Sequence, residues 1–263
     1  MRVIFMGTPD FSVGTLQAIY EAGHEVCLVV TQPDKPKGRG HAMQYTPVKE
    51  YAVEKGIEVF QPVKIREPEA VEKLRSCQAD IMVVVAFGQI VSKEILEMCP
   101  YGCINVHASL LPKYRGAAPI QWSVINGDKE TGVTTMQMNE GLDTGDMLLI
   151  EKMPIAIDDT AESVFDKLSV MGGEIIVKTL ELLEKGEITP VKQVESLSSY
   201  APMLDKSISE IDFAKDALTV HNLIRGLYSW PIAQTTFKGK KLKIYKSALS
   251  ELSLDFSSVF CFR

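Results

Sequence analysis

The feature that most constrains this chain is an uninterrupted apolar run between Asp80 and Gly88, which reads DIMVVVAFG. A strand with one face in water alternates polar and apolar residues, but this run has no polar face. Such a run is typical of a parallel strand that helices cover on both sides of a sheet. The run therefore predicts a sheet that is buried inside an α/β fold.

Strand-like and helix-like segments alternate around this run. Two short apolar runs, 3–7 and 26–30, enclose a segment whose apolar residues recur at helical spacing, and Gly23 is suited to end that helix. Further helices are predicted over 47–56, 67–75, 118–126 and 160–185, and further strands over 102–109, 132–138 and 146–153. Alternation of this kind predicts an open α/β sheet with right-handed crossovers.

The pattern changes after Gly186. Residues 188–206 are rich in Ser and Pro and show weak periodicity, which indicates a linker. A helix-like segment, a Trp-Pro turn and two strand-like stretches follow it. We therefore divide the chain into a first domain over 1–187, a linker over 188–206 and a second domain of β character over 207–263.

Composition argues against several classes of protein. No apolar run approaches the ~20 residues of a membrane helix, and the apolar stretch before Gly7 is too short for a signal peptide. The five cysteines are an odd number without a CxxC pair, which argues against a disulfide framework and a zinc site. We expect a cytoplasmic protein that needs no metal, and nothing in the sequence indicates an obligate protein partner.

The charge is unevenly distributed along the chain. The formal net charge is −6, so the protein as a whole would not attract nucleic acid. Against this trend, residues 34–49 contain Lys35, Lys37, Arg39 and Lys49 with one acid, and residues 238–246 contain five lysines and no acid. Basic patches can bind phosphates even on an acidic protein, although charge alone favours ordinary solvated segments.

The stretch GCINVHASLLP, from Gly102 to Pro112, carries the first candidate site residues. Side chains alternate across a strand, so Asn105 and His107 share one face near the end of the predicted strand. Ligands of open α/β sheets bind at that edge. An amide can donate to an oxyanion, and an imidazole can hold or release a proton near neutrality. A satisfied core histidine remains the alternative at this stage.

Asp143 is a third candidate, because it lies in a loop between Gly141 and Gly145 directly after a predicted strand. Glycines allow close backbone approach, and a carboxylate near His107 would stabilise an imidazolium. The alternative is a turn in which Asp143 bonds to its own backbone, and the residues alone do not place it beside His107. The turn after the first strand reads MGTPDF and lacks GxGxxG, which argues against a dehydrogenase.

Six segments then occur together in one order and spacing. They read GTPDF, TQPDKPKGRG, VVVAFGQI, GCINVHASLLPKYRGAAPIQW, TGVTTMQMNEGLDTGD and YAPML. Together they resemble the methionyl-tRNA formyltransferase family over about residues 2–248. The combination of Asn105, His107 and Asp143 resembles the pattern of folate-dependent formyltransferases in general. The segment DKPKGRG and the later Trp230-Pro231 pair resemble the methionyl-tRNA group of that family.

The resemblance implies a Rossmann-like open-sheet domain followed by a small β-barrel that resembles an OB fold. It implies transfer of a formyl group from 10-formyltetrahydrofolate to the amino group of methionyl initiator tRNA, for translation initiation. It also implies Asn105, His107 and Asp143 as catalytic residues. The implied folate-binding residues are Phe87, Gly88, Gln89, Ile90, Ser109, Leu110, Leu111, Pro112, Asn139, Glu140, Gly141 and Leu142. The implied tRNA-binding residues are Lys35, Lys37, Arg39, Lys240, Lys241 and Lys243.

The chain departs from the family pattern at two places. Ala108 stands where many relatives have Gly, and the tail SELSLDFSSVFCFR matches nothing expected, so the barrel is expected to be incomplete. Two rival functions stay open. One is another folate-dependent formyltransferase or a formyl-folate hydrolase on the same domain, against which the two basic segments argue. The other is a non-catalytic module that binds RNA or another ligand.

Overall fold

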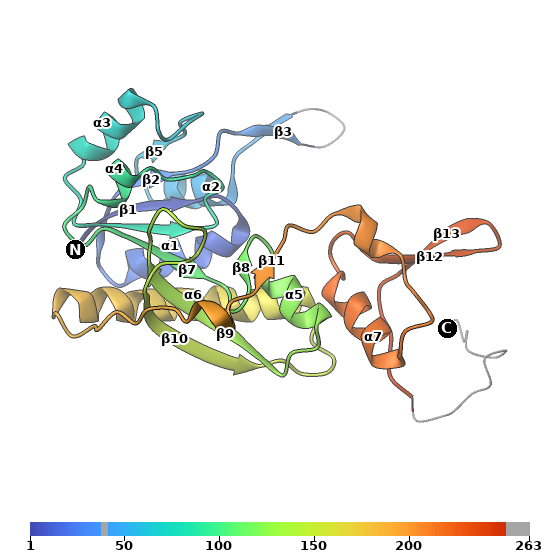
Figure 1. Cartoon of the computed structure of the whole chain (residues 1–263). Helices are drawn as coiled ribbons and strands as arrows, with labels where there is room; N and C mark the ends of the chain where they lie inside the picture. Colours follow the sequence, from blue (N-terminus) through green and yellow to red (C-terminus); the bar gives the residue numbers. More distant parts are fainter. Residues whose placement is uncertain (38–41, 251–263) are drawn as a thin grey trace.

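A computed structural model describes residues 1–37 and 42–250 of the chain (Figure 1). Within those residues, seven strands form one sheet in the order β10-β9-β7-β6-β1-β2-β5. The strands are β1 (Arg2–Gly7), β2 (Glu25–Val30), β5 (Val59–Phe60), β6 (Ile81–Val85), β7 (Cys103–His107), β9 (Glu130–Gln137) and β10 (Met147–Pro154). Strands β1, β2, β5, β6 and β7 are parallel to one another, whereas β9 pairs antiparallel with both β7 and β10. The predicted open α/β sheet is confirmed, and it is a mixed sheet.

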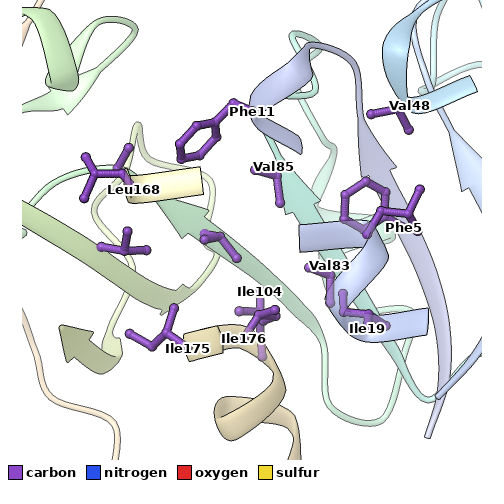
Figure 2. Close-up of a cluster of buried hydrophobic side chains, with 14 of the residues drawn as sticks. Phe5, Phe11, Ile19, Val48, Val83, Val85, Ile104, Leu168, Ile175 and Ile176 are labelled. Carbon is purple, nitrogen blue, oxygen red and sulfur yellow. The ribbon is translucent and has the colours of Figure 1, made fainter. Parts of the chain in front are cut away.

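Residues 81–85 of the apolar run between Asp80 and Gly88 form β6, which lies between β1 and β7. Its odd-numbered residues, such as Val83 and Val85, pack in a cluster with α1 (Asp10–Glu21) and α6 (Ala161–Glu184), as Figure 2 shows. Its even-numbered residues pack against α3 (Pro68–Ser76) and α4 (Lys93–Leu96) on the other face. Helices therefore cover both faces, which is why the run has no polar side.

Local signals set the boundaries of the helices. Thr160 caps α6 and shares a reciprocal capping box with Ser163, so the helix begins one residue after the predicted start. Thr46 caps α2 (Pro47–Glu54), whose first residue is a proline that needs no hydrogen-bonded N–H. The helix α5 (Pro119–Ile125) likewise begins at a proline.

The stretch predicted as a linker lies along the first part of the chain. Its short strand β11 (Tyr200–Ala201) pairs with β8 (Arg115–Gly116), and 3₁₀ turns occur at η1 (Glu195–Leu197) and η2 (Lys206–Ser209). Beyond it, α7 (Ala217–Gly226) is followed by a hairpin of β12 (Ala233–Phe237) and β13 (Lys240–Ile244). A closed barrel is not seen up to residue 250, and residues 251–263 lie outside the described part.

The helix α7 is docked on α5 through a third apolar cluster. Ala118, Ile224 and Leu227 are buried in it, and Trp122 packs against it. Two buried polar residues of α7 complete the docking. His221 Nε2 bonds to the carbonyl of Ile157 at 2.8 Å, and Arg225 Nη1 donates to the carbonyls at residues 156 and 159 at 3.1 and 2.9 Å.

We predict that Arg225→Ala lowers the free energy of unfolding by about 2–4 kcal/mol, because it leaves one buried and one partly buried carbonyl without a charged donor. Denaturant unfolding measures the change. Leu218→Ala on the same helix is the matched control, since Leu218 is 46% exposed and should cost far less. Equal losses in the two variants would contradict the docking role of Arg225.

Candidate active site

A cleft of about 710 Å³ opens at the carboxyl ends of β6 and β7. Its wall brings together segments that are far apart in the sequence. The contributing stretches include 86–91, 105–108, 116–121 and 138–145, with Phe165 and Tyr200. The strand order reverses between β1 and β6, and residues that follow β1, β6 and β7 line the cleft. Such a reversal point is the usual place for a ligand in an open α/β sheet.

Strand β7 delivers Asn105 and His107 to this cleft, as predicted from their alternation. Along the strand, Asn105 and His107 lie on the same face as Cys103. Cys103 belongs to the apolar cluster on the α3 and α4 side of the sheet. The Oδ1 atom of Asn105 is buried and has no hydrogen-bond partner among the described residues. An unpaired buried amide oxygen costs about 1–3 kcal/mol, and such a cost is characteristic of a site that a ligand completes.

The position of His107 is set by one hydrogen bond. Its Nε2 lies 2.8 Å from the carbonyl oxygen of Tyr114. Because a carbonyl only accepts, Nε2 must carry a proton, and the other ring nitrogen is left for chemistry. That atom, Nδ1, lies 3.8 Å from Oδ2 of Asp143. The ring is therefore oriented by the backbone and faces a carboxylate.

Asp143 reaches His107 through an unusual backbone conformation. Its φ is +51°, in the left-handed region that non-glycine residues seldom adopt. The carboxylate is anchored, since Oδ2 accepts from the backbone N–H of Gly116 at 2.8 Å. The backbone is anchored too, because the amide of Gln193 donates to the carbonyls of Asp143 and Gly145, each at 2.8 Å. The carboxylate of Asp143 therefore bonds to a distant backbone N–H, which differs from the self-bonded turn that was the alternative.

Two predicted folate-binding loops form part of the cleft wall. Phe87, Gly88, Gln89 and Ile90 follow β6, and Asn139 to Leu142 follow β9. Gln89 anchors the first loop, since its amide oxygen accepts from Ile65 N at 2.7 Å. Asn139 Oδ1 shapes the second loop by accepting from Gly141 N at 3.0 Å.

The third predicted folate stretch, Ser109 to Pro112, lies outside the residues that form this wall. Ser109 is fully buried, and its hydroxyl donates to the carbonyl of Lys113 at 2.6 Å. Leu111 is buried as well, and its N–H donates to Thr134 Oγ1 at 3.2 Å. The stretch forms the turn that brings the carbonyl of Tyr114 back to His107.

The described members of the predicted tRNA-binding set lie on the strand pairs β3–β4 and β12–β13, which both extend toward the right in the view of Figure 1. Lys35 and Lys37 belong to β3 (Lys35–Lys37), which pairs with β4 (Ala42–Gln44), and Lys35 is exposed. Arg39 lies outside the described residues. The second hairpin carries its lysines exposed on β13, namely Lys240, Lys241 and Lys243.

Lys49, which belongs to the first basic segment of the sequence, has a different role. Its ammonium pairs with Asp34 at the base of the β3–β4 hairpin, and both side chains are mostly buried. Burial raises the pKa of Asp34, but hydrogen bonds from Lys49 and Gln61 outweigh it and hold the pKa below its ordinary value. Lys49 therefore fixes the base of the hairpin.

Sequence reasoning missed the residues on β8 and along 191–201. Gly116, Tyr200 and Gln193 contact or support the cleft, although they lie in segments with weak periodicity. At position 116 the signal available from the sequence was the residue type, glycine. Gly116 has a φ of +111°, and a Cβ added there would lie 2.5 Å from the ring of Tyr200. Nothing in the local pattern around Gln193 indicated a contact with Asp143.

Neither a metal cluster nor a membrane helix is found in the part of the chain that the structure describes. No group of three or more His, Cys, Asp or Glu residues there could hold a metal ion. No helix there is both long and apolar enough to cross a bilayer. Burial raises the pKa of the Cys103 thiol at the base of β7, which keeps it protonated and unreactive.

We predict that Gly145→Ala displaces the loop that carries Asp143, because an added Cβ would lie 1.7 Å from the carbonyl oxygen of Gln137. Amide hydrogen exchange over residues 137–147 should become faster. Gly23→Ala is the control, since Gly23 has a φ of +84° but nothing within 4 Å of an added Cβ. It should lower stability through backbone strain alone and leave exchange over 137–147 unchanged.

Comparison with known proteins places the chain in a family. Residues 1–180 match the formyl transferase family, and residues 203–257 match the C-terminal domain of formyl transferases. The N-formyltransferase of Helicobacter canadensis, solved with folinic acid and dTDP-3-aminofucose, has a TM-score of 0.73 at 24% identity. The alignment covers 94% of this chain and 87% of that one, which shows a shared fold.

Two relatives are much more similar in sequence. The methionyl-tRNA formyltransferase of Agathobacter rectalis is 59% identical over 256 residues, which cover 97% of this chain and 83% of that protein. The methionyl-tRNA formyltransferase of Lachnospira eligens is 57% identical over 251 residues, which cover 95% and 80%. The resemblance seen in the motifs is confirmed, and the chain belongs to the methionyl-tRNA formyltransferase family.

Proposed function

We propose that this protein transfers the formyl group of 10-formyltetrahydrofolate to the amino group of methionyl initiator tRNA, for translation initiation. The observation that carries this function is the meeting of Asn105, His107 and Asp143 in one cleft, in a chain whose relatives are methionyl-tRNA formyltransferases. These three residues are the proposed catalytic residues.

The cleft suits the formyl donor in size and chemistry. A volume of about 710 Å³ falls within the range of small-molecule sites. Apolar side chains such as Val84, Phe87 and Met136 lie on the wall with the backbone of Gly88 and Gly141, which leaves room for a flat ring and offers polar groups at its edge. We therefore assign folate binding to residues 87–90 and 139–142, with 109–112 supporting the turn behind them.

The catalytic residues act on charge that develops during the transfer. When the methionyl amine adds to the formyl carbon, negative charge grows on the former carbonyl oxygen. Asn105 donates to that oxygen from its amide nitrogen, and His107 donates from Nδ1 when it is protonated. One such preorganised donor is worth ~10²–10³ in rate. The buried Oδ1 of Asn105 is free to accept from the incoming N–H group.

Proton movement falls to His107 and Asp143. Nε2 of His107 is committed to the carbonyl of Tyr114, so only Nδ1 can exchange a proton with the reactants. Asp143 faces Nδ1, stabilises its charged form and assists transfer from the attacking amine to the folate nitrogen that leaves. Proton transfer by a positioned side chain contributes typically ~10²–10⁴ in rate.

The two exposed lysine-bearing hairpins are assigned to the tRNA. Phosphates attract basic side chains even on a protein of net charge −6. We propose that Lys35, Lys37 and Arg39 on one segment and Lys240, Lys241 and Lys243 on the other contact the tRNA backbone. In this scheme residues 1–187 hold the catalytic site, and residues 207–263 form a tRNA-binding part that follows the segment 188–206.

A turnover assay tests the function directly. Purified protein is mixed with 10-formyltetrahydrofolate and charged initiator tRNA, and formylmethionyl-tRNA is measured. Parallel reactions replace the tRNA by a sugar nucleotide amine, by glycinamide ribonucleotide or by water. Formylation of the tRNA alone supports the proposal. Turnover only with a small amine or water would identify another folate enzyme, and binding without turnover would identify a non-catalytic module.

Asn105→Ala and Asp143→Asn should each reduce kcat for tRNA formylation by about 10²–10³. The first removes an oxyanion donor, and the second removes the negative charge that faces His107. Folate titration and circular dichroism serve as controls for the cleft and the fold. If either variant formylated tRNA at close to the wild-type rate, the mechanism above would be wrong.

The affinity for tRNA should fall as salt rises, because lysine contacts with phosphates release counterions. Lys241→Ala and Lys243→Ala should each reduce the slope of log affinity against log salt by roughly one. Lys178→Ala on α6 is the control, since Lys178 is also exposed but lies outside both hairpins. Equal slopes in all four proteins would remove the β12–β13 hairpin from the tRNA interface.

A further inference from the structure

The segment from Val191 to Ala201, which we call the strap, is fixed to the two loops that flank the catalytic residues. At one end, Val191 exchanges two backbone hydrogen bonds with Met147, each at 2.8 Å. At the other end, Tyr200–Ala201 pairs in parallel with Arg115–Gly116. The first contact lies just beyond the Asp143 loop, and the second lies just beyond Tyr114, the partner of His107.

Between these ends, the side chain of Gln193 makes three hydrogen bonds. Its Nε2 donates to the carbonyls of Asp143 and Gly145, each at 2.8 Å. Its Oε1 accepts from Nε of Arg115 at 3.0 Å. Both amide protons and the amide oxygen are therefore used, so the side chain has one orientation and ties β8 to the Asp143 loop.

The strap supports both members of the His107 and Asp143 pair. Gln193 holds the carbonyl of Asp143, a residue whose left-handed backbone needs support from its surroundings. On the other side, Ser199 Oγ accepts from the N–H of Tyr114 at 2.9 Å, and the carbonyl of Tyr114 accepts from His107. The relative position of the two catalytic groups thus depends on a segment that lies outside the sheet.

We propose that Gln193 is a positioning residue for formyl transfer, and that it sets the distance between the Asp143 carboxylate and Nδ1 of His107. Gln193 is not part of the cleft wall and acts only through the backbone of Asp143 and Gly145. This inference rests on the proposed function, because the transfer is the reaction whose rate the positioning affects.

Three variants separate positioning from general support. Gln193→Glu keeps the acceptor for Arg115 but turns an oxygen toward two carbonyl oxygens, which removes both bonds to the Asp143 loop. Gln193→Met keeps the length of the side chain and removes all three bonds without adding charge. Glu195→Gln is the matched control, since Glu195 is largely exposed and its carboxylate accepts from Nη1 of the same Arg115 and from Ser198 Oγ, without contacting the Asp143 loop in the described bonds.

Steady-state formylation of methionyl initiator tRNA is measured from pH 5.5 to 9 for each protein, an interval that contains the ordinary titration midpoint of a histidine, about 6.5. Both Gln193 variants should lose about 10- to 100-fold in kcat, because small displacements of a catalytic group cost up to ~10² in rate. The KM for the formyl donor should stay near its wild-type value. The pH at which kcat is half of its maximum should shift in Gln193→Met. Glu195→Gln should match the wild type in both kcat and this pH.

The outcomes distinguish the inference from the function on which it rests. If the wild type is active and Gln193→Glu keeps its kcat, Gln193 only braces Arg115 and the inference is overturned. A loss in Gln193→Met by one common factor at every pH would also overturn it, because a partly unfolded fraction lowers the rate uniformly. A wild type without turnover on methionyl-tRNA would overturn the proposed function itself.

Discussion

A strand that is covered on both faces leaves no room for polar side chains except where the strand ends. In this sheet, the residues of β6 alternate between the α1 and α6 cluster and the α3 and α4 cluster, and both sides are apolar. Strand β7 continues the pattern through Cys103 and Ile104 and breaks it at Asn105 and His107. The break is tolerated because these residues face a cleft, and it places an amide and an imidazole at the edge of the sheet.

The elements that the sequence predicted well are those whose boundaries and faces are set by residues within the same segment. The helix α6 was expected over 160–185 and spans Ala161–Glu184, because Thr160 and Ser163 form a cap that depends only on neighbouring residues. Strand alternation placed Asn105 and His107 on one face, and Gly141 and Gly145 marked the loop that carries Asp143. Periodicity, caps and turn residues report on their own segment, so they can be interpreted without the rest of the molecule.

The features that escaped prediction depend on partners that are distant along the chain. The 3.8 Å approach of His107 to Asp143 requires β9 to return antiparallel beside β7, a direction that local patterns do not specify. Gln193 and Arg115 are 78 residues apart, and the segment of Gln193 has the polar, irregular composition of a connecting loop. Residues 109–112 carry a recognisable motif, but they are not among the residues that line the cleft wall. Their position depends on three-dimensional packing, which the motif does not specify.

The helix α5 shows how the cleft and the C-terminal part are mechanically joined. Pro119, Ile120 and Gln121 on this short helix line the cleft, whereas Ala118 and Trp122 belong to the cluster that holds α7. Gly226 fits closely on the same helix, since an added Cβ would lie 2.4 Å from Ile125. A single helix therefore contacts the cleft with one side and the C-terminal part with the other. The position of the C-terminal part relative to Asn105 and His107 therefore depends on how the seven residues of α5 pack.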